Sequence, residues 1–115
     1  MIRGDVFWVD LIPRSGSEQT GRRPAVIVSR DSFNALEGWR SMIVVPLTTA
    51  RSRTHRGPTA VPIPAGSSGL LKDSIALCHQ VTTLDRGKLS KRITTLSPAA
   101  MRAIDDGLRA ALSLD

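Results

Sequence analysis

The sequence predicts a mainly β domain of the α+β class, a small barrel or sandwich of short strands with a C-terminal helix. Short runs of β-branched and aromatic residues recur along most of the chain, and glycine or proline separates them. A helical pattern stands out only near the C-terminal end. No long helices alternate with the strands, so a parallel α/β sheet is not expected. The sequence has 115 residues, close to the commonest domain size, so we expect residues 1–115 to form a single domain.

Six strands are expected, and turn residues bound most of them. Pro13 ends the first strand, and the third runs into Pro46. Pro62 interrupts the fourth strand, which predicts an edge position or a bulge, because proline cannot donate to a ladder. The fifth strand is expected to continue unbroken from Ser74 to Val81. The expected strands cover residues 6–9, 25–28, 42–45, 59–63, 74–81 and 92–95.

The C-terminal helix has clear start signals. Ser97 suits the N-cap position and Pro98 the first helical position, while Leu96 and Met101 are spaced to form a hydrophobic staple. An apolar stripe follows at helical spacing, so we expect this helix to cover an open side of the barrel. The stripe consists of Met101, Ile104, Leu108, Ala111 and Leu112.

A shorter helix is expected to begin near Asp31 or Ser32 and to end before Gly38. Two segments without strand or helix patterns, residues 14–22 and 50–58, are expected to form long loops. Loops held by a rigid scaffold often contain functional residues, so these two segments are the first places to search for a site.

The charge balance suits a polyanionic partner. Lys and Arg number 16 against 10 Asp and Glu, which gives a net charge of +6. Nucleic acid, an anionic membrane surface or an acidic protein segment would each fit. The lone Cys78 cannot form an internal disulfide, which favours the reducing cytoplasm. There is neither the apolar run of a signal peptide nor that of a membrane span, so no membrane association is expected.

The first candidate site is the segment 16–24, which combines a loop, one carboxylate and two guanidiniums. Arginine binds phosphate well because its planar fork donates two parallel hydrogen bonds. Arg23 precedes Pro24 at the start of an expected strand, so its backbone is restricted. The competing interpretation is a solvated loop with ordinary surface charges.

The second candidate site begins where a strand ends at Thr48 and Thr49. Arg51 and Arg53 follow within a few residues, so hydroxyls and guanidiniums together could bind a phosphodiester. The competing interpretation is a threonine pair of high strand propensity beside a solvated loop. We expect the basic segment 51–56 to make general electrostatic contacts rather than to catalyse a reaction.

Other site types have little support. No spacing matches a zinc site, no glycine-rich segment matches a phosphate-binding or dinucleotide-binding loop, and no nucleophile elbow is present. We therefore expect neither a metal nor a cofactor.

Three blocks of the sequence resemble MazF/PemK-type toxins, and together they span nearly the whole chain. The first comprises Gly4-Asp5-Val6, Val9-Asp10-Leu11, Gly16-Ser17-Glu18-Gln19 and Arg23-Pro24-Ala25-Val26. The second is Val45-Pro46-Leu47-Thr48-Thr49. The third comprises Asp73-Ser74, Gln80-Val81 and Leu84-Asp85, followed by the closing helix.

The resemblance implies a CcdB-like, SH3-like barrel that forms a homodimer, cleaves RNA sequence-selectively, and is blocked by an acidic MazE-type antitoxin. In that family the residues matching Arg23 and Thr48 are the catalytic pair, and the residue matching Glu18 is implicated in some members. We further expect contacts to single-stranded RNA from Ser17, Gln19, Arg22, Thr49, Arg51, Arg53 and Gln80.

These roles fit a reaction that needs no metal, because RNA supplies its own nucleophile, the 2′-hydroxyl. Arg23 would stabilise the developing charge, Thr48 would hydrogen-bond a nonbridging oxygen, and Glu18 is the best available base. The products would be a 2′,3′-cyclic phosphate and a 5′-hydroxyl. Two alternatives remain: a CcdB-like gyrase poison without nuclease activity, and a non-catalytic RNA-binding SH3-like module.

Overall fold

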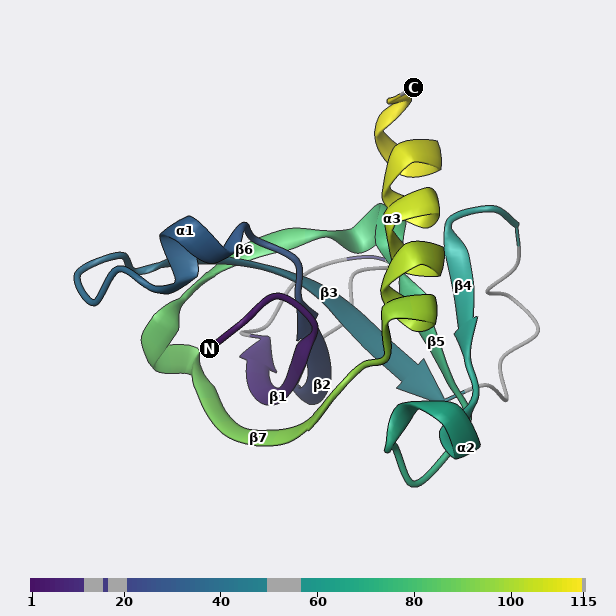
Figure 1. Cartoon of the computed structure of the whole chain (residues 1–115), viewed down its shortest axis with the longest axis horizontal. Helices are drawn as coiled ribbons and strands as arrows, with labels where there is room; N and C mark the ends of the chain where they lie inside the picture. Colours follow the sequence, from purple (N-terminus) through teal and green to yellow (C-terminus); the bar gives the residue numbers. More distant parts are fainter. Residues whose placement is uncertain (12–15, 17–20, 50–56, 115) are drawn as a thin grey trace.

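The computed structural model describes residues 1–11, 16, 21–49 and 57–114 (Figure 1). Strands dominate the described part of the chain, and the longest helix lies at its C-terminal end. In chain order the elements are β1 (Asp5–Leu11), β2 (Gly21–Ile27), α1 (Asp31–Asn34), β3 (Ser41–Thr49), β4 (Ala60–Ile63), α2 (Ala65–Ser68), β5 (Ser74–Leu77), the 3-10 helix η1 (Cys78–Gln80), β6 (Thr82–Asp85), the 3-10 helix η2 (Arg86–Lys88), β7 (Leu89–Thr95) and α3 (Pro98–Leu112).

The strands form one curved antiparallel arrangement in the order β4-β5-β3-β2-β1-β7, and β6 pairs with β3. The long strand β3 lies at the centre of the fold (Figure 1). One edge of β3 pairs with β2, and the other pairs first with β6 and then with β5. The expected mainly β, barrel-like domain with a C-terminal helix is confirmed.

Two apolar clusters fill the two faces of the sheet. Val26 and Val45, cross-strand partners on β2 and β3, belong to the first cluster. Ile27 and Val44, the next pair along, belong to the second. This alternation follows from the two-residue period of a strand. The first cluster includes Ile104 of α3, so the helix covers that face of the sheet as expected.

Helix α3 begins as the sequence predicts. The Ser97 hydroxyl oxygen accepts a hydrogen bond from the Ala100 backbone N–H at 3.2 Å. Leu96 and Met101 both join the first cluster, as a hydrophobic staple requires. Leu112 is 53% exposed, so the apolar stripe extends beyond the core. Within the described ranges, no helix has the length and apolar character needed to cross a membrane.

The expected unbroken strand over residues 74–81 is wrong in its second half. Strand β5 ends at Leu77, and η1 separates it from β6, which the sequence did not predict. The Cys78 N–H donates to the Thr59 carbonyl at 2.9 Å instead of pairing with β3. The break lies where β3 changes its partner strand from β6 to β5. The apolar run contains no glycine or proline to mark the break.

By contrast, the expected edge position of Pro62 is confirmed, because β4 pairs with β5 alone among the described strands.

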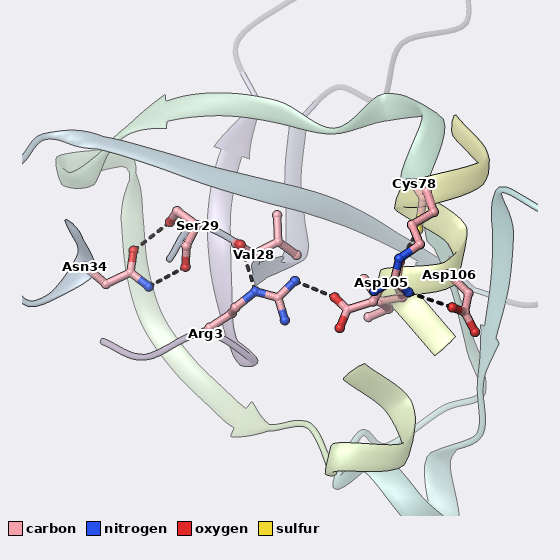
Figure 2. A network of polar contacts seen from close by, with 9 residues as sticks. Arg3, Val28, Ser29, Asn34, Cys78, Asp105 and Asp106 are labelled. Atoms are coloured by element: carbon pink, nitrogen blue, oxygen red, sulfur yellow. Dashed lines mark hydrogen bonds and ion pairs between the residues drawn. The ribbon is translucent and has the colours of Figure 1, made fainter. Parts of the chain in front are cut away.

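A polar network ties the N-terminal segment to α3. The Arg3 guanidinium donates to the Val28 carbonyl at 2.9 Å and to the Asp105 carboxylate at 2.5 Å. Figure 2 shows the Arg3 side chain lying between these two acceptors. Nearby, the Ser29 hydroxyl donates to the Asn34 side-chain oxygen, and the Asn34 amide donates back to the Ser29 carbonyl. The network anchors the helix at the end of the sheet opposite to the candidate site.

Candidate functional site

The two residues expected to be catalytic lie at the same end of neighbouring strands. Ala25 of β2 pairs with Pro46 of β3, and this is the last pair of their ladder. Arg23 lies two residues beyond Ala25, and Thr48 lies two residues beyond Pro46, in the same direction because the strands are antiparallel. Both residues are half-buried. Positions 25 apart in sequence are thereby brought to one end of the sheet.

Arg23 and Thr48 also share a face of the sheet. Side chains two residues apart on a strand point to the same side, so Arg23 follows Ala25 and Thr48 follows Pro46. Ala25 belongs to the second apolar cluster, the one that contains Val44. A guanidinium and a hydroxyl therefore stand on one face, where that cluster ends.

A pocket of about 390 Å³ adjoins Arg23. This size is within the range of small-molecule sites, about 300–1,000 Å³. The lining combines apolar residues with cationic and hydroxylated ones. The lining consists of Trp8, Arg22, Arg23, Pro24, Thr49, Leu70, Leu71, Lys72, Ser74 and Ile93.

An arginine stacked on tryptophan forms one side of this pocket. The Arg22 guanidinium carbon lies 5.3 Å from the centre of the Trp8 ring. Trp8 pairs with Pro24 across the β1–β2 ladder, and Arg22 lies two residues before Pro24, so both side chains stand on one face. The cation–π contact restrains the guanidinium beside the cavity.

The pocket is electrostatically positive. It is lined by Arg22, Arg23 and Lys72, and within the described part of the chain no lining residue carries a carboxylate. Asp73 follows Lys72 in sequence, but its carboxylate accepts a hydrogen bond from the Ala65 N–H at 2.9 Å, at the start of α2. Asp10 is the cross-strand partner of Arg22, but it does not line the pocket. The arrangement favours an anionic or electron-rich ligand.

The remaining expected contact residues are distributed as follows. Thr49 is exposed, pairs with Ser74 and lines the pocket. Gln80 ends η1, which contacts β3, and it does not line the pocket. Five expected site residues lie outside the described part of the chain: Ser17, Glu18, Gln19, Arg51 and Arg53.

Sequence reasoning missed half of the pocket. The sequence pattern predicts only that at least one of Phe7 and Trp8 is a core residue, and it singles out neither Lys72 nor Ile93. Alternation along β1 contains the only relevant signal: Phe7 and Val9 enter the second cluster, so Trp8 must face the other side. That Lys72 and Ile93 meet Trp8 there depends on tertiary contacts between β1, β7 and the segment before β5.

No group of three or more His, Cys, Asp or Glu side chains among the described residues is arranged to hold a metal ion. The chemistry available at the described site is therefore that of guanidinium, ammonium and hydroxyl groups: charge stabilisation and hydrogen-bond donation.

Comparison with known proteins identifies the family. Residues 2–112 match the model of the PemK-like, MazF-like toxins of type II toxin–antitoxin systems. The chain is 37% identical over 114 residues to the endoribonuclease MazF of Staphylococcus saprophyticus, covering 99% of this chain and 92% of that protein. It is also similar to a solved mycobacterial endoribonuclease in complex with its cognate antitoxin, with a TM-score of 0.78, 29% identity, and coverage of 100% and 97%. MazF of Deinococcus radiodurans shares the fold, with a TM-score of 0.79 at 24% identity. The chain therefore belongs to the PemK-like, MazF-like toxin family of type II toxin–antitoxin systems.

Proposed function

We propose that this chain is an endoribonuclease that cleaves single-stranded RNA to a 2′,3′-cyclic phosphate and a 5′-hydroxyl, and that it acts as the toxin of its pair. The main support is the position of Arg23 and Thr48 at the same end of β2 and β3, on one face of the sheet. The relative from Staphylococcus saprophyticus is named as an endoribonuclease. The positive charge of the adjoining pocket fits a polyanionic substrate.

The reaction is an internal displacement at phosphorus. The 2′-oxygen attacks the adjacent phosphate, its proton passes to a base, the bond from phosphorus to the 5′-oxygen breaks, and that oxygen takes up a proton. Arg23 stabilises the extra negative charge on the phosphoryl oxygens and is the candidate proton donor. Thr48 donates a hydrogen bond to a nonbridging oxygen. Preorganised donors of this kind commonly supply the largest part of a rate enhancement.

Glu18 is the proposed base. A guanidinium is protonated at all ordinary pH values, so Arg23 cannot take up the proton. A carboxylate with an ordinary pKa near ~4.3 is a weak base, and partial burial against substrate would raise its pKa and strengthen it. The remaining proposed RNA contacts are Ser17, Gln19, Arg22, Thr49, Arg51, Arg53 and Gln80.

The proposed partners follow from the same family. The mycobacterial relative was solved with its cognate antitoxin. We propose an acidic MazE-like antitoxin that competes with RNA for the positive surface, a homodimeric toxin, and action in the cytoplasm. No cofactor is proposed, because RNA carries the nucleophile and the protein needs only to align, deprotonate and stabilise.

The two alternatives are less well supported. A gyrase poison on this barrel needs no paired guanidinium and hydroxyl beside a positive pocket. A non-catalytic RNA-binding module would hold RNA without cutting it. Incubating the protein with labelled RNA, and separately with gyrase and DNA, distinguishes all three functions.

The decisive experiment is cleavage of RNA in the presence of a chelator, with sequencing and chemical analysis of both fragment ends. Wild-type protein should leave cyclic phosphate and 5′-hydroxyl ends, and Arg23→Ala should cut at least about 10²-fold more slowly while staying folded. Arg102→Ala, on the exposed side of α3, is the matched control for loss of one arginine and should cut normally. Cleavage that requires added magnesium, or 5′-phosphate products, would contradict the scheme.

A further inference from the structure

The pocket beside Arg23 has the composition of a nucleobase site. Trp8 and Arg22 form a stacked pair at 5.3 Å, and Leu70 and Ile93 supply apolar walls. Bases in single-stranded RNA stack on aromatic rings and on guanidinium planes. Arg22 is exposed, so the outer face of its guanidinium is accessible to such a base. Arg23 also lines the pocket, but alternation along β2 directs its side chain to the opposite face of the sheet from Trp8 and Arg22. A base held in the pocket therefore belongs to a nucleotide that passes around this strand end from the proposed reaction centre.

The hydrogen-bonding groups of the pocket restrict which base fits. Arg22 and Lys72 only donate hydrogen bonds, whereas the hydroxyls of Thr49 and Ser74 can donate or accept. Among the described residues that line the pocket, none carries a carboxylate or a side-chain amide that would pair with an exocyclic amine. Guanine and uracil present carbonyl oxygens to such donors, while adenine and cytosine present amino groups at the corresponding positions.

We infer that the pocket formed by Trp8, Arg22 and Lys72 binds one base of the RNA next to the scissile phosphodiester and selects a keto base, guanine or uracil. This inference rests on the proposed ribonuclease function for the location of the base. The stack with Trp8 and Arg22 supplies affinity, and the donors on Arg22 and Lys72 supply the selection. The pocket thereby contributes to the sequence preference of cleavage from one side of the reaction centre.

The test uses oligonucleotides that cannot be cut, so that binding is measured apart from cleavage. Fluorescently labelled six-nucleotide 2′-O-methyl strands of uridine and cytidine form one matched pair, and those of inosine and adenosine form another. Within each pair a carbonyl oxygen is exchanged for an amino group, and the adjacent ring nitrogen changes from an N–H donor to an acceptor. We expect the uridine and inosine strands to bind at least roughly fivefold more tightly than their partners, the size of one modest hydrogen-bond difference.

Fluorescence locates the bound base. Trp8 and Trp39 are the two tryptophans of the chain, and Trp39 stacks on Phe33 beyond the other end of β2. In a Trp39→Phe protein, Trp8 is the single tryptophan, and its emission should fall as the uridine strand binds. Unchanged emission at saturation would overturn the inference.

Variants test the assignment of roles. Trp8→Ala should weaken binding roughly tenfold, while Trp8→Phe should retain most of the affinity because it keeps an aromatic face. Lys72→Ala should reduce the preference for keto bases, whereas the control Arg102→Ala should leave it unchanged. If Trp8→Ala fails to fold, Leu71→Asp replaces it: Leu71 is 99% exposed at the pocket rim, and a carboxylate there should repel the strand.

Failure of the inference and failure of the proposed function have different signatures. Normal cleavage by folded Trp8→Ala, with unchanged KM and cut sequence, overturns the pocket assignment and leaves the ribonuclease intact. Trp8-dependent, keto-selective binding by a protein that cuts no RNA supports the base pocket and contradicts the ribonuclease. Equal binding of the two members of each pair, or no RNA binding at all, overturns the inference.

Discussion

Gly107 of α3 lies directly against the side chain of Cys78: a β-carbon added at Gly107 would come within 2.7 Å of the Cys78 Sγ and 2.6 Å of a Val61 methyl carbon. Glycine inside a helix costs about 1 kcal/mol relative to alanine, so helix propensity alone predicts that Gly107→Ala stabilises the protein. Overpacking a tight core costs about 1–3 kcal/mol. We therefore expect a net loss of about 1 kcal/mol in the free energy of unfolding, measured by urea denaturation.

A second substitution separates the steric cause from a general intolerance of change in α3. In a Cys78→Ala background the sulfur is gone, so Gly107→Ala should cost less than it does in the wild type. Equal costs in both backgrounds would assign the limit to Val61 of β4 rather than to Cys78. A rise in stability in the wild type would show that neither contact limits this position.

Burial of Cys78 predicts a loss of stability at alkaline pH. Desolvation, with a smaller contribution from the Asp105 carboxylate, raises the pKa of the thiol to about 11. An unfolded thiol ionises near ~8.5, so between these values the unfolded chain loses a proton that the folded protein keeps. The free energy of unfolding should therefore fall as pH rises from about 8.5 toward 11, by at most about 1.4 kcal/mol per pH unit.

The comparison variant for this effect is Cys78→Ala. The chain has no tyrosine, so that side chain adds nothing to the alkaline titration. Wild type and variant should converge in stability as pH increases through this range, and thiol reagents should label the native protein slowly. Parallel stability curves for the two proteins would refute a buried, protonated thiol.

Thr48 tests the proposed hydroxyl donor. Thr48→Val keeps the shape but removes the hydroxyl, so kcat should fall by about 10², the usual effect of removing one preorganised donor. Thr48→Ser retains the hydroxyl and should stay within roughly tenfold of wild type. Single-turnover cleavage at saturating RNA measures both variants.

Thr49→Val is the matched control, because Thr49 lies next in sequence and lines the pocket instead. Its effect should be on KM more than on kcat. A loss of kcat in Thr49→Val that equals the loss in Thr48→Val would remove the distinction between the two hydroxyls.

Local signals in the sequence were sufficient to predict most of the fold. Ser97 and Pro98 start α3 where capping rules place the start, and Pro62 lies on the edge strand. The break after Leu77 was missed because its cause is not local. β3 exchanges one partner strand for another at that point, and the intervening turn directs Cys78 beneath α3.

The site could be predicted only in part for the same reason. The chemistry of the sequence marked Arg23 and Thr48 as candidates, and the family resemblance supplied their catalytic roles. The β2–β3 register then explains why they lie at one end of the sheet. The pocket depends on Trp8, Lys72 and Ile93 meeting from three separate segments. No spacing in the sequence encodes that meeting, because it follows from how the curved sheet brings β1 and β7 beside the segment before β5.

The salt dependence of RNA binding distinguishes phosphate contacts from base contacts. If the bound strand has three or four phosphates neutralised, log affinity should fall against log salt with a slope of about −2 to −3. Arg23→Ala, proposed to face the phosphodiester, should make that slope shallower by about 0.7, the value for one phosphate on a single strand. Lys72→Ala should lower affinity for uridine strands while leaving the slope nearly unchanged, because its ammonium is assigned to a base. Titrations of the uncleavable uridine strand at several salt concentrations measure all three slopes.

An affinity of the wild type that does not change with salt would contradict electrostatic binding. Equal changes of slope in both variants would place Lys72 on the phosphate backbone instead of a base.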